Sequence, residues 1–415
     1  MEPTVMELAS RAEAWREFLY YKQDKQHLSA GEEAKLRRFV DSAAYLPLCR
    51  AWQEGRFPSR CPRKSVVSKA GTGKKRVVYS FEGDEGIFLK FLAFQLYRYD
   101  CFFSDNCYAF RRNCGVRDAM KRLLAHRRIG QGWCLKVDVS NYFNSIDVEI
   151  LLDKLSFVRE DEPALYELFR RILLNRTVLY RGQLIEEAHG AMAGIPVAPF
   201  FANVYLGDTD AFFEKEKVPY FRYSDDILLF ADSREELERR QEQLYAQLQG
   251  LGLSVNPDKV KVAAPGEYWD FLGFGYRGGE LDLSDNTIRK TKGRIRRKAE
   301  ALRRWQRKKG LTADKAAIGL IHAMNRKFYG SSADEEPEDE FTWSRWFFGS
   351  LTTDRGLKEI DAYLQEYIRY AVTGRHYKGN YRIPYEQLKA WGYRSLVHEF
   401  WEGRNVDAGK EHGNG

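Results

Sequence analysis

The spacing of apolar residues alternates along the chain between a helical and a strand period, which predicts a mixed α+β protein. Apolar positions three or four residues apart, typical of helices, occupy the stretches 7–50, 84–98, 147–175, 196–213 and 234–251. Pro196 and Pro199 suit the start of the fourth stretch, and Gly250 and Gly252 suit the end of the fifth.

Short apolar runs between these stretches predict strands. They lie at 66–79, 135–139, 178–185, 220–231 and 260–276. The first and third are expected to be hairpins, and the fourth is expected to be two strands joined by an acidic turn. From residue 285 onward the chain is again helical in pattern.

The helical stretch that follows residue 285 is strongly basic. Between residues 289 and 309 it holds twelve Lys and Arg residues and one acid, Glu300. Ile295, Ala299 and Leu302 give it an apolar seam with which to pack, so a basic face remains for an anion. A solvated charged helix is the alternative, but the imbalance of charge favours the binding of phosphate groups.

The composition agrees with an anionic partner. The formal net charge is +8, the hydrophobic fraction is 44% and the aromatic fraction is 14%, as in an ordinary globular chain. No apolar run reaches the roughly 18 residues of a membrane helix, and the first residues resemble neither a signal nor a transit peptide. The cysteines form no CxxC pair, so zinc is not expected. We expect a cytoplasmic protein without a membrane partner.

Three acids stand where predicted strands end. Asp138 closes the strand at 135–139, and Asp225 and Asp226 occupy the turn within 220–231. If these strands are neighbours, the carboxylates converge, and two such charges about 4 Å apart repel by roughly 4 kcal/mol at an effective dielectric near 20. Divalent ions with oxygen ligands, Mg²⁺ first, would neutralise them. The alternative is a plain turn, because Asp favours turns.

The sequence around these acids resembles that of reverse transcriptases. Residues 135–146 resemble the first catalytic motif of that family, and Tyr223-Ser224-Asp225-Asp226 resembles its Tyr–any–Asp–Asp motif. Four other blocks of the family are present in the expected order. A fingers block at 108–119 lies upstream of the first motif. The block that supports nucleotide and template lies at 190–203, a lysine motif at 252–259 and a primer-grip hairpin at 271–274. The resemblance covers residues 60 to 280.

The resemblance implies an α+β right-hand polymerase, with fingers, a palm built on a ferredoxin-like or RRM-like antiparallel sheet, and an α-helical thumb. The expected domains are an N-terminal helical region at 1–60, fingers at 61–135, a palm at 136–280 with fingers helices inserted at about 147–185, a basic thumb and RNA-binding region at 281–402, and a flexible tail at 403–415.

The resemblance also implies roles for individual residues. Asp138, Asp225, Asp226 and Lys259 are expected to be catalytic, and Asp138, Asp225, Asp226 and the Val139 carbonyl to ligate two Mg²⁺ ions, with Mn²⁺ as a substitute. Nucleotide binding is expected of Lys69, Lys75, Arg76, Phe143, Ala193 and Gly194. Primer or nucleic-acid binding is expected of Tyr223, Phe271, Leu272, Gly273, Arg294, Arg297, Lys298, Arg375, His376 and Lys378.

Two of these roles have plain alternatives. Phe143 matches the aromatic that closes off a 2′-hydroxyl and so selects deoxynucleotides, but a packed aromatic at a strand end would look the same. Lys259 matches a lysine that donates a proton to pyrophosphate, but a solvent-facing lysine is the other interpretation. In addition, Ala193 and Ala198 stand where the family usually has Gln and Ser. This departure suggests specialised synthesis, repetitive or loosely templated.

The C-terminal part indicates the kind of reverse transcriptase. Residues 341–348, 374–381 and 392–397 resemble the thumb region of bacterial defence-associated and Abi-like enzymes. We therefore expect an RNA-directed DNA polymerase that makes cDNA by two-metal nucleotidyl transfer and acts with a dedicated non-coding RNA in antiphage defence. Its other partners would be dNTPs, the RNA–DNA duplex product and, as an open question, a second copy of the chain. The alternatives are a retron or diversity-generating reverse transcriptase, or an RNA-binding scaffold with a relic palm.

Overall fold

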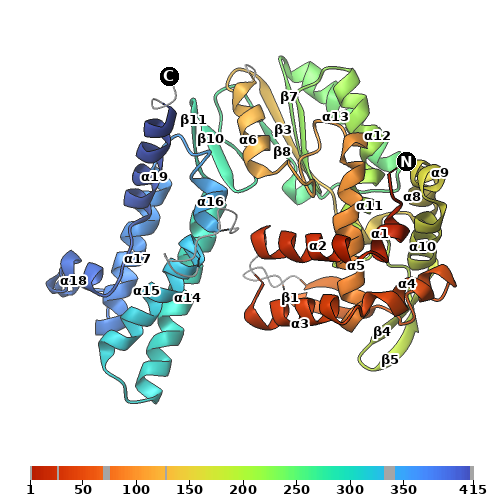
Figure 1. Ribbon diagram of the computed structural model, residues 1–415. Helices are drawn as coiled ribbons and strands as arrows, with labels where there is room; N and C mark the ends of the chain where they lie inside the picture. The colour runs from red at the N-terminus through yellow and green to blue at the C-terminus, as the bar shows by residue number, and fades with distance from the viewer. Residues whose placement is uncertain (1, 26–27, 69–74, 127–128, 331–341, 412–415) are drawn as a thin grey trace. The chain divides into compact units, whose positions relative to one another are not determined.

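The computed structural model describes residues 2–25, 28–68, 75–126, 129–330 and 342–411. The chain divides into two compact units, Met1–Pro265 and Gly266–Gly415, and each contains both helices and strands (Figure 1). Within the three sheets, every strand pair except β1 with β4 is antiparallel. The expected α+β class, with antiparallel sheets, is confirmed.

The first unit begins with five helices, of which the first, second and fourth pack on the fifth and the third packs on the second. They are α1 (Val5–Ala9), α2 (Ala12–Lys25), α3 (Ala30–Asp41), α4 (Tyr45–Gln53) and α5 (Gly83–Gln95). Trp15 of α2 is fully buried and stacks on Phe91 of α5, with ring centroids 4.0 Å apart, and on Tyr45 of α4, at 5.0 Å. Buried aromatic pairs of this kind stabilise a core beyond the area they bury. The helices predicted at 7–50 and 84–98 are confirmed.

The remaining helices of the first unit lie between and around the strands. They are α6 (Val116–Ala125), α7 (Tyr142–Ser145), α8 (Val148–Lys154), α9 (Ser156–Asp161), α10 (Pro163–Leu174), α11 (Ala198–Tyr205), α12 (Gly207–Lys215) and α13 (Arg234–Gly250). The prediction of one helix over 196–213 is wrong, because the chain breaks at Leu206 and starts α12 at Gly207. Glycine is a poor residue for a helix interior, and here it begins a helix instead.

A four-stranded sheet joins the two predicted hairpins in the order β2-β1-β4-β5. The hairpins are β1 (Arg63–Ser68) with β2 (Lys75–Ser80) and β4 (Thr177–Tyr180) with β5 (Gln183–Glu186). One parallel pair, Arg63 with Leu179, joins them.

A second four-stranded sheet has the order β6-β7-β3-β8 and is wholly antiparallel. Its strands are β3 (Trp133–Asp138), β6 (Tyr220–Tyr223), β7 (Asp226–Ala231) and β8 (Lys261–Ala263). Numbered along the chain, the strands lie in the order 2-3-1-4, which is the order of a ferredoxin-like β-α-β-β-α-β unit. Helix α13 packs on β3 and β7, and α6 packs on β6.

The two faces of this sheet are chemically different because successive side chains of a strand alternate in direction. Val137 and Ile227 are opposite one another and lie on the face buried in the main core. Asp138 and Asp226 are also opposite one another, one residue further on, and so lie on the other face. The sequence pattern therefore separates an apolar face from the face that carries the acids.

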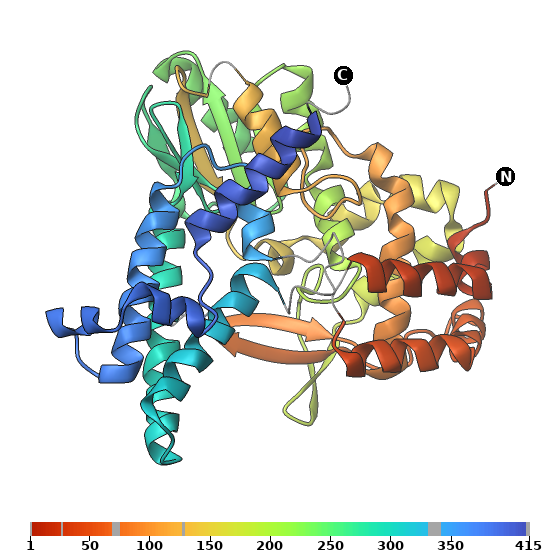
Figure 2. The same cartoon turned by 60° about the vertical axis from the view of Figure 1, so that its left-hand side comes forward.

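The second unit starts with a three-stranded antiparallel sheet, β9 (Trp269–Phe271), β10 (Phe274–Arg277) and β11 (Glu280–Leu283). Helices α14 (Asp285–Lys308), α15 (Ala313–Tyr329) and α17 (Arg355–Thr373) then run side by side, as Figures 1 and 2 show. The shorter helices are α16 (Trp343–Phe347), α18 (Tyr385–Ala390) and α19 (Leu396–Glu411). The predicted seam of α14 is confirmed at Ile295 and Ala299, which are both fully buried.

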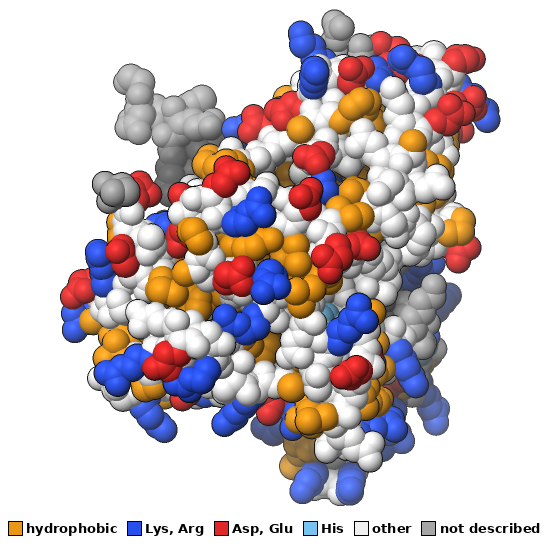
Figure 3. All heavy atoms as spheres, turned by 90° about the vertical axis from the view of Figure 1, so that its right-hand side faces the viewer, with side chains coloured by type: hydrophobic (Ala, Val, Ile, Leu, Met, Phe, Trp, Pro, Cys, Tyr) orange, Lys and Arg blue, Asp and Glu red, His pale blue; other side chains and the backbone are white. Residues whose placement is uncertain are grey.

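Lys and Arg side chains lie alongside Asp and Glu across most of the face drawn in Figure 3. None of the described helices is both long and apolar enough to cross a membrane.

Candidate active site

The structure brings Asp138, Asp225 and Asp226 to one edge of the second sheet. Asp138 ends β3, Asp226 begins β7, and the two are direct cross-strand partners on the same face. Asp225 occupies the turn between β6 and β7, and its carbonyl accepts a hydrogen bond from the Val139 N–H at 3.1 Å. The convergence predicted from the strand pattern therefore occurs.

The turn that carries Asp225 has an unusual backbone. Tyr223 and Asp226 are paired, so Ser224 and Asp225 alone make the connection between the strands. Ser224 has a φ of 61°, in the left-handed region that side chains other than glycine seldom adopt. Such a conformation costs about 1–3 kcal/mol and persists only where the surroundings hold it.

Burial makes the two carboxylates of this turn costly to ionise. It raises the pKa of Asp226 from 3.8 to about 6, although Lys136 acts in the opposite direction. Burial also raises the pKa of Asp225, and the Asp138 charge adds to this effect. The nearest cation to Asp138 is Lys259, whose Nζ lies 2.5 Å from Asp138 Oδ1. The structure thus places the predicted Lys259 against the acids.

The donor atoms at this edge suit a hard divalent cation, which prefers carboxylate and carbonyl oxygens. The hydrogen bond from the Val139 N–H to the Asp225 carbonyl places the main chain of Val139 beside the acidic turn. As the side chains stand, no three acids, His or Cys among the described residues form a closed cation site. Asp138 is instead paired with Lys259, so a cation would have to replace that contact.

Phe143 lies beside this region on α7. Its ring is partly buried and meets the ring of Phe110 edge-on, with centroids 6.1 Å apart at 73°. Its carbonyl accepts a hydrogen bond of 2.8 Å from the N–H of Ala191. The contact with Phe110 was not predicted, because the two residues are far apart in the sequence.

Ala193 and Gly194 are tied to β2 and to α7. The Ala193 carbonyl accepts from the Tyr79 N–H at 2.8 Å, and the Ala193 N–H donates to Asn144 Oδ1 at 3.1 Å. Gly194 has a φ of 108°, and a Cβ there would lie 2.8 Å from the Tyr79 carbonyl oxygen, so only glycine fits. Asn144, adjacent to Phe143, also donates to the Val77 carbonyl at 3.3 Å. Asn144 was not among the predicted site residues, and its only indication in the sequence is that it directly follows Phe143.

The basic residues expected to hold a triphosphate lie on the first hairpin. Lys75 and Arg76 are exposed at the start of β2, one to four residues before Val77 and Tyr79, which contact Asn144 and Ala193. Lys69 falls outside the described residues. The exposed bases of β2 therefore belong to the same strand that supports Ala193.

A cavity of about 750 Å³ lies between α2, α3 and α5 and is also lined by Ser80, the last residue of β2. Lys22, Lys35 and Lys90 line it, as does Gly194, while the three acids do not. Burial and the neighbouring Lys90 lower the pKa of Lys22 to about 8.

The other predicted nucleic-acid contacts belong to the second unit, except Tyr223, which is partly buried beside Asp226. Leu272 and Gly273 form the two-residue turn between β9 and β10, and Phe271 is fully buried. Arg294, Arg297 and Lys298 are exposed on α14, and Arg375 and Lys378 are exposed after α17. His376 stacks on Tyr370 at 4.5 Å, and its Nδ1 contacts Glu366 Oε1 at 2.6 Å.

Half of the chain matches a known protein family. Residues 67–276, half of the chain, match the family described as reverse transcriptase (RNA-dependent DNA polymerase). The retron Ec83 reverse transcriptase of Escherichia coli is 26% identical over 151 residues, which cover 34% of this chain and 47% of the relative. The matched part thus spans about half the length of that curated relative.

The solved structures to which the chain is similar include telomerases from two Candida species. Apo telomerase from Candida tropicalis, truncated from its C-terminal domain, has a TM-score of 0.44 at 10% identity, over 54% of this chain and 55% of that one. Telomerase from Candida albicans, in complex with a fragment of telomeric RNA, has a TM-score of 0.41 at 12% identity, over 88% and 70%. On the family match and the order of its motifs, the chain belongs to the reverse transcriptase family.

Proposed function

We propose that this protein is an RNA-directed DNA polymerase that makes cDNA by two-metal nucleotidyl transfer. The observation that carries the proposal is the cross-strand pairing of Asp138 with Asp226, with Asp225 in the turn beside them. A fold that holds partly buried carboxylates together at the cost of raised pKa values is best explained by cations that bind there.

Asp138, Asp225, Asp226 and the Val139 carbonyl would hold two Mg²⁺ ions, or Mn²⁺ in their place. Such ions supply charge stabilisation for the attacking hydroxyl and the leaving pyrophosphate. The protein itself would orient the substrates: Phe143 against the sugar, Lys75 and Arg76 toward the triphosphate, and Ala193 and Gly194 near the new base pair. Lys259 would give a proton to pyrophosphate, and its contact with Asp138 supports this role.

In this proposal the ferredoxin-like sheet is the palm, the β1–β2 hairpin and the helices around it are the fingers, and the helices from α14 onward form the thumb. The exposed bases Arg294, Arg297 and Lys298 on α14, with Arg375, His376 and Lys378, would contact the backbone of the RNA–DNA duplex. Phe271, Leu272 and Gly273 would form the primer grip, at the two-residue turn between β9 and β10.

We further propose that the template is a dedicated non-coding RNA and that the biological role is defence of a bacterium against phage. The likeness of residues 341–348, 374–381 and 392–397 to defence-associated enzymes supports this role. A retron reverse transcriptase is the second candidate, because part of this chain is similar in sequence to such an enzyme.

The decisive experiment measures Mg²⁺-dependent incorporation of dNTPs on a primed RNA template by the purified protein. The proposal expects cDNA from the wild type and none from the double variant Asp225→Ala with Asp226→Ala. A variant of the distant ion pair Arg234–Glu238, Arg234→Gln, serves as the control that should keep full activity. If the double variant kept both RNA binding and phage protection, the protein would instead be an RNA-binding scaffold. Sequencing the nucleic acid that copurifies with the wild type would identify the RNA.

A further inference from the structure

A charged side chain is buried directly beneath the acidic turn. Arg222 of β6 has no exposed surface, and it points to the face of the sheet opposite Asp226, because it precedes Tyr223, the cross-strand partner of Asp226. A buried guanidinium is very costly unless its N–H groups are all paired with acceptors. The partners of Arg222 therefore indicate why the fold retains it.

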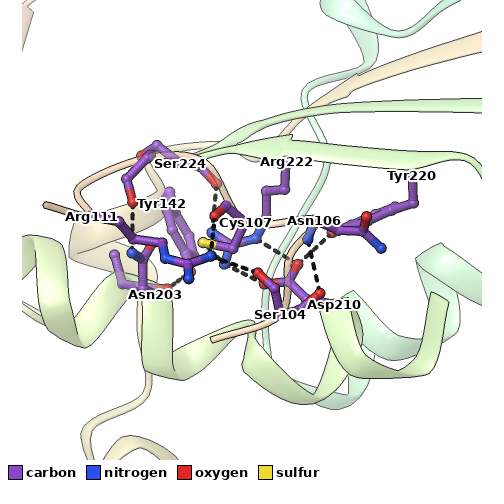
Figure 4. A network of polar contacts seen from close by, with 12 residues as sticks. Ser104, Asn106, Cys107, Arg111, Tyr142, Asn203, Asp210, Tyr220, Arg222 and Ser224 are labelled. Carbon is purple, nitrogen blue, oxygen red and sulfur yellow. Dashed lines mark hydrogen bonds and ion pairs between the residues drawn. The ribbon is translucent and has the colours of Figure 1, made fainter. Parts of the chain in front are cut away.

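Asp210 of α12 supplies the counter-charge. Nε of Arg222 donates to Asp210 Oδ1 at 2.7 Å, and Nη2 donates to Oδ2 at 2.5 Å, so the pair is bidentate (Figure 4). Asp210 is 1% exposed and also accepts a hydrogen bond of 3.0 Å from the Tyr220 hydroxyl. The two-point contact fixes the plane of the guanidinium as well as its position.

The remaining terminal nitrogen of Arg222 contacts the turn itself. Nη1 donates to the Ser224 carbonyl at 3.2 Å, as Figure 4 shows. Ser224 is the residue with the left-handed backbone, and its carbonyl belongs to the peptide that leads into Asp225. One planar group thus connects helix α12 to the peptide that sets the direction of Asp225.

A loop segment fixes the main chain of Arg222 from the outer side of β6. The Arg222 N–H donates to the Asn106 carbonyl at 2.9 Å, and the Tyr108 N–H donates to the Arg222 carbonyl at 3.0 Å. Between them, Cys107 is fully buried and its Sγ accepts from Nη2 of Arg222 at 3.0 Å. The backbone and the side chain of Arg222 are therefore both held before any substrate arrives.

We propose that Arg222 and Asp210 are positioning residues that hold the Ser224 peptide in its left-handed conformation and so aim Asp225 and Asp226 at the metal ions. The inference rests on the proposed function, since it concerns the metal site of that function. Stability alone does not explain the pair, because buried ion pairs can often be replaced by apolar residues without loss of stability. What an apolar pair cannot do is donate an N–H to the Ser224 carbonyl.

The test uses a variant that removes both buried charges together, Arg222→Met with Asp210→Asn. Asn still accepts from Tyr220, and no charge is left unpaired, so the fold should survive. We expect the thermal unfolding temperature to stay within a few degrees of the wild type. We expect kcat for dNTP incorporation to fall by about 10- to 100-fold, the size of effect that small misplacements of catalytic groups cause. The Mg²⁺ concentration for half-maximal rate should rise.

A second variant, Arg222→Lys, keeps the positive charge beside Asp210. An ammonium group lacks the planar fork that reaches both Asp210 oxygens and the Ser224 carbonyl at once, so the same loss is expected without an unpaired charge. The matched control removes another largely buried arginine and its partner in the same unit, Arg240→Met with Glu216→Gln, which makes no contact with the turn. The control should keep the wild-type kcat.

Mn²⁺ binding measured by electron paramagnetic resonance separates this inference from the proposed function, since it requires no catalysis. We expect weaker Mn²⁺ binding in both Arg222 variants than in the wild type and the control. A folded Arg222 variant with wild-type Mn²⁺ affinity and kcat would overturn the positioning role. A wild type that binds Mn²⁺ but does not polymerise would overturn the proposed function and leave the positioning role to be judged by Mn²⁺ affinity.

Discussion

Asp138 and Asp226 face each other across β3 and β7 with no residue between them in the register of the sheet. Burial raises the pKa of Asp226, and the charge of Asp138 on the same face adds to this effect. The stability of the metal-free protein should therefore depend on pH.

The first prediction concerns stability without metal. The pKa of Asp226 is raised to about 6 in the folded protein, so the folded state resists its ionisation, and stability falls as pH rises from about 4 to about 6. The shift of about two pH units corresponds to at most roughly 3 kcal/mol. In EDTA, Asp226→Asn should therefore unfold at higher denaturant than the wild type at pH 7 and at the same denaturant at pH 4. A wild type that is the more stable protein at pH 7 would contradict this.

The second prediction concerns the choice of sugar. Phe143→Ala should incorporate ribonucleotides that the wild type rejects, because it opens space beside the sugar. Phe110→Ala should relax the selection less, since Phe110 acts through its edge-on contact with the Phe143 ring. The measurement is the ratio of kcat/KM for dNTP and rNTP. Phe102→Ala, which changes an exposed aromatic away from Phe143, is the control. An unchanged ratio in Phe143→Ala would show that Phe143 does not select deoxynucleotides.

The third prediction concerns the basic face of α14. Changing Arg294, Arg297 and Lys298 to Ala should weaken binding of an RNA–DNA duplex and reduce the slope of log affinity against log salt by about 2 to 3, near one phosphate for each base. The control triple variant changes three exposed arginines that already pair with a neighbouring glutamate: Arg11, Arg170 and Arg234. Equal salt slopes in the two triple variants would show that α14 is only a solvated helix.

The fourth prediction concerns the fold of the second unit. Asp361 of α17 is buried and accepts hydrogen bonds from the Tyr393 hydroxyl, the Ser395 hydroxyl and the Leu396 and Val397 N–H groups at the start of α19. Asp361→Ala should lower the free energy of unfolding by about 3 kcal/mol, because buried donors lose a charged acceptor. Chemical denaturation measures this, and the exposed Glu386→Ala should show no such loss.

Much of this arrangement follows from local sequence. The period of the apolar residues gave the helices and strands, and the position of Asp138 and Asp225 at strand ends gave their convergence, because the ends of neighbouring antiparallel strands meet. The third strand of the second unit, β11, was not predicted, since Glu280 to Leu283 is short and half polar. The break at Leu206 was missed because apolar runs lie on both sides of it, at 204–206 and 211–213.

The residues that support the three acids could not have been predicted from local sequence. Arg222 looks like one more base in a basic chain, and nothing local to Asp210 shows that a strand twelve residues later will bury it. Asn144 and Phe110 likewise act through contacts across more than 30 residues. Such roles depend on tertiary packing, which the spacing of residues along one segment does not encode.

The contact of residues 106–108 with β6 has a consequence for solubility. β6 is the last strand of its sheet, and an uncovered last strand offers free N–H and carbonyl groups to any other chain. Asn106 and Tyr108 pair with two of these groups, the N–H and the carbonyl of Arg222. Cys107, which lies between them, forms an isolated β-bridge with Arg222. The same loop that steadies Arg222 therefore also guards the sheet against intermolecular strand pairing, so mutations that loosen it should promote aggregation as well as slow catalysis.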